Sequence, residues 1–152
     1  MTSRETIYSA LFALIQPLLT ASTIKTASRI ALNWDKTDPE DQPALYQIEL
    51  GENVVTGNGV PNIYTLNCEW YVYVNPTGDP TELHSTPINN ILDSLEAVLV
   101  PPAGQENQTL GGLVPRIFVG QREIHEGLLG SQVIGILPIS IIFMPAYSAG
   151  GC

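Results

Sequence analysis

The part of the sequence that decides the fold is residues 63–74, IYTLNCEWYVYV. Successive strand residues point to opposite faces, so one apolar face is shared by Tyr64, Leu66, Cys68, Trp70, Val72 and Val74. A strand of this length would span about 40 Å, roughly twice the usual length. Such a long strand often extends past its own domain.

Four other segments have strand-like patterns, namely residues 24–34, 44–50, 113–119 and 132–143. The last is apolar on both faces, which predicts that it is central or covered by another chain. Pro138 within it indicates a bulge or an edge, because proline lacks the N–H donor. Gly57-Asn58-Gly59 predicts a turn or a mobile loop over residues 53–61, and Gly127 and Gly130 predict a second turn.

Two segments have helical periodicity. Thr2 and Glu5 match a capping box before the first, and Pro17 is expected to bend or end that helix. Its apolar side chains cover about 160° of the helix surface, wider than one core contact requires. Tyr8, Phe12 and Ile15 on this wide face are therefore candidate subunit contacts.

The second helix is predicted to begin at Thr86 as N-cap, with Pro87 at its first position, and to end before Pro101. The order of elements predicts an α+β fold, a mainly antiparallel β-sheet with two α-helices packed on one face. We expect residues 1–146 to form a single domain and residues 147–152 a flexible C-terminal tail.

Charged residues make up 14% of the 152 residues, against roughly 25% in an ordinary soluble domain, and the net charge is −9. Residues 37–115 contain no lysine or arginine, so this segment disfavours nucleic-acid binding and anionic membranes. Because obligate interfaces are depleted in charge, we interpret the deficit as surface given to neighbouring subunits. The alternative is a neutral surface rich in Ser, Thr, Asn and Gln.

The sequence contains no phosphate-binding loop, nucleophile elbow, zinc-protease motif or dinucleotide fingerprint. Histidine stands near carboxylates twice, in the pairs Glu82 with His84 and His125 with Glu123 and Glu126. One histidine and one or two turn-borne carboxylates are typical of solvated surface. We therefore predict no catalytic, cofactor or metal site, and no enzyme.

Cys68 lies in the apolar strand and Cys152 ends a Gly-rich tail, so both thiols are expected to be reduced, which indicates an intracellular origin. Residues 128–144 carry no charge, but Pro138, several glycines and many β-branched residues argue against a membrane span.

Several strings resemble the tail terminator (tail completion) proteins of tailed bacteriophages. They are residues 4–8 (RETIY), residues 87–96 (PINNILDSLE), residues 109–114 (TLGGLV), the two glycines at 127 and 130, and the closing strand around residues 137–139 (LPI). The resemblance covers nearly the whole chain, although its motifs are short.

This resemblance implies a structural virion protein that forms a homo-oligomeric ring, usually a hexamer, at the head-proximal end of the tail tube. The ring ends tube polymerisation, docks the head through a head–tail connector protein, and lets DNA pass without specific binding. It would be assembled in the host cytoplasm, with no cofactor and no catalysis. The alternatives are a head-side connector or tail tube protein, and a small-molecule binding domain or enzyme using Trp70, His84 and Glu82.

Particular residues are candidates for the lumen and for the subunit contacts. The acids expected to line a lumen are Asp35, Asp38, Glu40 and Asp41, because fixed negative charge keeps a polyanion mobile. The loop at residues 101–112 is expected to order on assembly. The remaining candidate subunit contacts are Tyr71, Tyr73, Gln105, Asn107 and Gln108.

Overall fold

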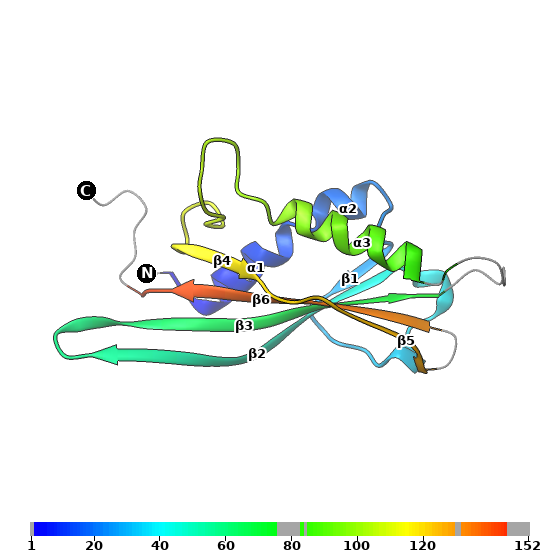
Figure 1. Ribbon diagram of the computed structural model, residues 1–152, viewed down its shortest axis with the longest axis horizontal. Coiled ribbons are helices and arrows are strands. Elements are labelled where there is room, and N and C mark those ends of the chain that lie inside the picture. The colour runs from blue at the N-terminus through cyan, green and yellow to red at the C-terminus, as the bar shows by residue number, and fades with distance from the viewer. Residues whose placement is uncertain (1, 76–82, 84, 130–131, 146–152) are drawn as a thin grey trace.

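A six-stranded sheet carries the helices on one face (Figure 1). The computed structural model describes residues 2–75, 83, 85–129 and 132–145. The strands run in the order β1-β2-β3-β6-β4, and β5 also pairs with β6. Their bounds are Thr26–Ser28 (β1), Ala44–Gly57 (β2), Val60–Val74 (β3), Arg116–Val119 (β4), Glu123–Leu129 (β5) and Gln132–Phe143 (β6). The predicted α+β class is confirmed.

The antiparallel pair β3 and β6 forms the centre of the sheet, in register from Tyr64 opposite Phe143 to Val74 opposite Val133. The central position predicted for residues 132–143 is thus confirmed. Pro138 lies neither at a bulge nor on an edge strand. It stands where the neighbour of β6 changes from β4 to β5, and its carbonyl accepts a 2.8 Å hydrogen bond from Gly120 N–H. In an antiparallel strand the N–H and C=O of a residue point to the same side. The side of Pro138 that lacks an N–H therefore faces this junction, and the pairing of β6 with β3 does not need the missing donor.

The predicted extents of several elements were wrong. Only Thr26–Ser28 of residues 24–34 is strand, and it pairs with β2 in parallel. Within residues 53–61, the predicted turn is found at Asn58 and Gly59 alone, because β2 continues to Gly57 and β3 begins at Val60. β4 is shorter than predicted, and β5 was missed because its sequence alternates weakly and contains glycine.

The first predicted helix is divided into α1 (Arg4–Ala13) and α2 (Gln16–Thr20), with Pro17 in the first turn of α2. The predicted Thr2 and Glu5 capping box is wrong. Ser3 is the N-cap, and its hydroxyl accepts a 3.1 Å hydrogen bond from Thr6 N–H. α3 is Ser85–Val98, so Thr86 lies one residue inside the helix and not at its cap.

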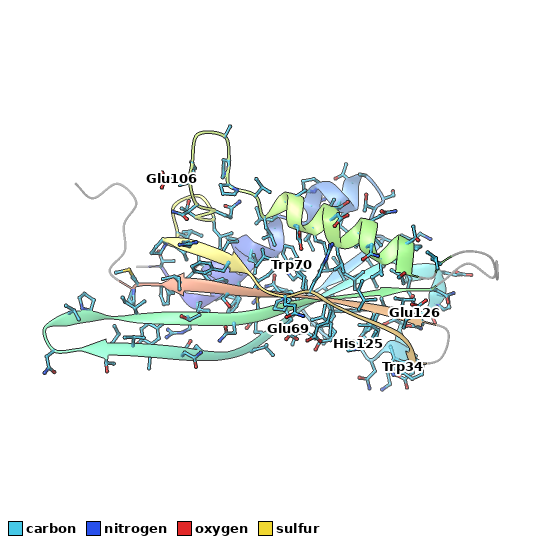
Figure 2. The ribbon with its side chains drawn as sticks, viewed as in Figure 1. Trp34, Glu69, Trp70, Glu106, His125 and Glu126 are labelled. Atoms are coloured by element: carbon cyan, nitrogen blue, oxygen red, sulfur yellow. The ribbon has the colours of Figure 1, made fainter. Side chains whose placement is uncertain are left out.

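The main core lies between these helices and the sheet. Figure 2 shows Trp70 on the helix side of the sheet, where it is fully buried. A buried polar bridge joins α1 to the sheet: Trp70 Nε1 donates to Gln47 Oε1 at 3.0 Å, and Gln47 Nε2 donates to the Tyr8 carbonyl at 3.0 Å. Tyr8 and Ile15 belong to this core, so the wide apolar face of the first helix is largely covered by its own chain.

A smaller apolar cluster lies on the opposite face and consists of Ala44, Tyr46, Tyr73 and Ile134. Residues 30–42 cross this face, with short 3-10 turns at Trp34–Lys36 and Pro39–Asp41. Trp34 packs against the cluster from below the sheet (Figure 2).

Candidate subunit interface

The strands β2 and β3 extend past the end of β6 as a two-stranded projection, which we call the β2–β3 arm and define as residues 52–63 (Figure 1). β3 pairs with β6 only from Tyr64 onward, so residues 60–63 have β2 as their neighbour. All of residues 52–63 are exposed. An isolated hairpin of this kind is marginally stable in water, so it is stabilised by its base or by a partner.

The arm is unusually apolar for an exposed segment. Val54, Val55, Val60 and Ile63 have 51%, 67%, 60% and 38% of their surface exposed. Residues 53–63 contain no charged side chain, although the chain as a whole carries a net charge of −9. Apolar, uncharged surface is characteristic of the centre of protein–protein interfaces.

The base of the arm is fixed to α1 by Arg4. Its guanidinium donates to both oxygens of the Glu52 carboxylate, at 2.7 and 2.8 Å, a bidentate geometry that sets direction as well as distance. The same guanidinium lies 4.8 Å from the ring centre of Tyr64 and 5.4 Å from that of Phe143. The hydrogen bond from Arg4 lowers the pKa of Glu52.

A second arginine joins α1 to β2 close by. Arg29 donates to Glu5 Oε1 at 2.6 Å and Oε2 at 3.0 Å, to Ser9 Oγ at 3.1 Å, and to Glu49. The hydrogen bond from Arg29, with a smaller one from Ser9, lowers the pKa of Glu5 from 4.5 to about 2. The acids near the base of the arm, Glu5, Glu49 and Glu52, are thus all paired with an arginine of the same subunit.

The four candidate lumen acids lie together on the loop that crosses the opposite face. Asp35, Asp38, Glu40 and Asp41 are all exposed. In the part of the chain that the structure describes, none of them forms an ion pair. Thr37 fixes the loop to the sheet, because its hydroxyl lies within hydrogen-bonding distance, 3.2 Å, of the hydroxyl of Tyr46 on β2. This arrangement presents unneutralised negative charge on a fixed support.

The loop at residues 101–112 rises from the helical layer, with Glu106 on one limb of it, below its highest point (Figures 1 and 2). Gln105 and Glu106 are exposed and Asn107 is half-buried. Gln108, in contrast, is only 7% exposed: its amide donates to the Val100 carbonyl at 3.2 Å and accepts from Leu110 N–H at 3.1 Å. Only the upper part of this loop is free to touch a neighbour.

The other candidate contacts are divided between core and surface. Tyr8, Ile15 and Tyr73 are buried within the subunit, whereas Phe12 and Tyr71 are half-buried. Tyr71 lies on the sheet face opposite the helices, and its pKa is raised to about 12, first by burial and then by a hydrogen bond with Glu69.

The residues considered for chemistry do not converge. Trp70 is fully buried, so it cannot contact a ligand, and Glu82 and His84 lie outside the described residues. Cys68 is buried in the core, and burial raises its pKa to about 12. His125 lies 3.3 Å from Glu123 at the surface. Cys152 lies outside the described residues.

The described residues also contain no metal-binding cluster and no helix suited to a membrane. No group of three or more His, Cys, Asp or Glu side chains is placed to hold a metal ion in these segments. None of the helices that the structure describes is long and apolar enough to cross a membrane.

No protein-family model matches the sequence, and the search of curated proteins gives no match. Solved structures do match the fold. One of them is a chain of the "Virion of native gene transfer agent (GTA) particle", with a TM-score of 0.55 and 8% sequence identity. The match covers 90% of this chain and 92% of that chain. The chain therefore shares its fold, over nearly its full length, with a component of that virion.

The arm and its anchors were missed in the sequence, although a signal for the arm was present. Asn58-Gly59 flanked by Val54, Val55 and Val60 is a strong hairpin pattern. In the turn, Gly59 has a φ of 77°, a conformation that favours glycine. Arg4 and Glu52 stand 48 residues apart, and nothing local predicts that they meet.

Proposed function

We propose that this chain is a structural virion protein that forms a ring, most simply of six copies, at the head-proximal end of a phage tail tube. The ring ends tube polymerisation and provides the docking surface for the head. The observation that carries the proposal is the β2–β3 arm, an exposed projection in which residues 53–63 carry no charge and include four exposed apolar side chains. Arg4 fixes its base through Glu52. Exposed apolar surface of this kind is stabilised by burial against another chain.

Three further observations support it. The fold is shared with a chain of a gene transfer agent virion, and the sequence resembles tail terminator proteins over the helices and the closing strand. The few charged groups near the arm are paired within the subunit, which leaves its surroundings suited to burial. No observation favours an enzyme, since Trp70 of the suggested ligand site is in the core.

The test is negative-stain microscopy and light scattering of the purified protein, alone and with tail tubes of the same virion. We expect rings that cap one end of each tube and stop its elongation. Binding only to DNA-filled heads would favour a connector, and spontaneous growth into long tubes would favour a tube protein. A monomer under all of these conditions would contradict the proposal.

The acids on residues 35–41 are proposed to face the lumen of the ring. A variant that replaces Asp35, Asp38, Glu40 and Asp41 by lysine should still form rings but should slow DNA ejection, because each lysine adds a phosphate contact. Glu106→Lys, on the loop at residues 101–112, makes a charge change of the same sign away from the lumen. Equal ejection rates for the two variants would exclude a lumenal position.

A further inference from the structure

A second surface of the subunit matches the arm in composition. We call it the distal sheet face, formed by Thr65, Asn67, Phe118, Ser140 and Ile142. Leu66, Cys68, Ile139 and Ile141 are buried under the helices, so the side chains that alternate with them point to the opposite face. Phe118 lies opposite Ser140 in the register of β4 and β6 and joins this set.

The distal sheet face has no apolar cover within the described segments. The second cluster and residues 30–42 lie at the other end of the sheet, around Tyr73 and Ile134. Neither Phe118, which is 38% exposed, nor Ile142 belongs to either apolar cluster. The helices lie on the other side of the sheet (Figure 1).

The face is also nearly free of charge. Its members are apolar or neutral polar, and Asn67 accepts a 3.2 Å hydrogen bond from Ser140. Glu69 stands at one end of the face. Arg116 lies directly opposite Ile142, and its guanidinium is 3.9 Å from the Phe118 ring centre, so one positive charge lies within the face. The members of the face include no acid, although the chain has a net charge of −9.

We propose that the β2–β3 arm of one copy packs on the distal sheet face of the next copy in the ring. The inference rests on the proposed ring and names the surfaces that build it. Two copies of so acidic a chain repel one another over most of their surface, and these two patches are where that repulsion is least. Contact between two different patches is heterologous, and such a contact builds a ring when the rotation between successive copies closes.

The dimensions agree. Residues 60–63 extend beyond β6 by about 13 Å at strand rise, and β4, β6 and β3 together span about 10 Å between their outer axes. Val55 and Ile63 are a cross-strand pair on the same face as Thr65. The contact would bury these two arm side chains against Phe118 and Ile142.

Cysteine cross-linking tests the contact. In a Cys152→Ser background, where buried Cys68 is retained, Val55→Cys and Phe118→Cys are made singly and together. After oxidation of rings, the double variant should give a ladder of covalent oligomers. The two single variants mixed should give covalent dimers, and neither should cross-link alone. As a control, Ile30→Cys replaces Phe118→Cys and should give no ladder, because Ile30 is 77% exposed and begins the loop at the other end of the sheet.

A second variant tests energy instead of proximity. Val55→Asp should raise the concentration needed for half-assembly by roughly tenfold or more, as expected for a charge placed in an interface core. Its monomer should melt like the wild type, because Val55 is exposed in the isolated subunit.

The outcomes separate this inference from the proposed function. Rings that cap tubes but give no Val55–Phe118 cross-link would overturn the arm contact and leave the ring proposal standing. Cross-linking of Val55→Cys to the tube protein instead would assign the arm a different partner and would also overturn it. If no ring forms with or without tubes, both proposals fail together.

Discussion

Replacing Gln47 with leucine would break the polar bridge between α1 and the sheet. The fully buried Trp70 N–H would lose its acceptor, Gln47 Oε1. The hydrogen bond from the Gln47 amide to the Tyr8 carbonyl would also be lost. An orphaned buried donor costs about 1–3 kcal/mol, and each lost hydrogen bond about 0.5–1.5 kcal/mol net. Allowing for the added apolar burial of leucine, we expect Gln47→Leu to lower the free energy of unfolding by about 2–3 kcal/mol.

The measurement is urea denaturation followed by far-UV circular dichroism, at a concentration where the protein is monomeric, because assembly would add its own stabilisation. The matched variant is Trp70→Phe, which removes the donor. In the double variant the unpaired Trp70 N–H no longer exists. Its unfolding free energy should therefore fall by about 1–2 kcal/mol less than the sum of the decreases in the two single variants. Wild-type stability for Gln47→Leu, or strictly additive losses, would refute this account of the bridge.

Three shorter predictions concern packing, pH and reactivity. A Cβ at Gly135 would lie 2.8 Å from Cγ1 and 2.9 Å from Cδ1 of Ile88, so Gly135→Ala should lower the unfolding free energy by about 1–3 kcal/mol, partly recovered by Ile88→Val. Glu5 is held by Arg29 at a pKa of about 2, so its contribution is full above pH 4.5 and is lost as pH falls towards 2. The melting temperature of the wild type should therefore fall more steeply over this range than that of Glu5→Gln, and parallel curves would contradict the ion pair. Buried Cys68, with its pKa raised to about 12, should resist alkylation at pH 8 until the protein is unfolded in denaturant; fast native labelling would place it at the surface.

Much of the fold could be predicted because its central elements carry their own signals. Residues 63–74 alternate with period two, residues 132–143 are apolar throughout, and α3 has helical spacing between a proline near its start and the prolines after its end. Each of these patterns is set by burial on one or both faces, which the sequence records directly.

The arm and the crossing loop could not be predicted in the same way. The glycines around Asn58 favour a loop, whereas the valines beside them favour a strand, and the pairing of β2 with β3 decides between the two. Residues 24–34 have a strand-like apolar pattern, yet Ile30 is 77% exposed and only three residues pair with β2. Whether an apolar segment is covered depends on partners distant in the sequence or on another chain. The surfaces proposed for assembly are apolar surfaces covered by another chain, so the sequence of one chain does not reveal their partner.

The central strand β3 is synthesised well before β6, the strand with which it pairs, and this delay affects folding on the ribosome. The hairpin of β2 and β3 is local and can form soon after residue 74 leaves the ribosome, whereas β6 is completed only at Phe143. Long-range pairing of this kind is slow to form, and unpaired strand edges promote aggregation. During that interval β3 exposes its free edge and the apolar side chains around Trp70. Chains that stop before residue 132 keep this edge open permanently, so premature termination should produce insoluble protein and not smaller subunits that enter a ring.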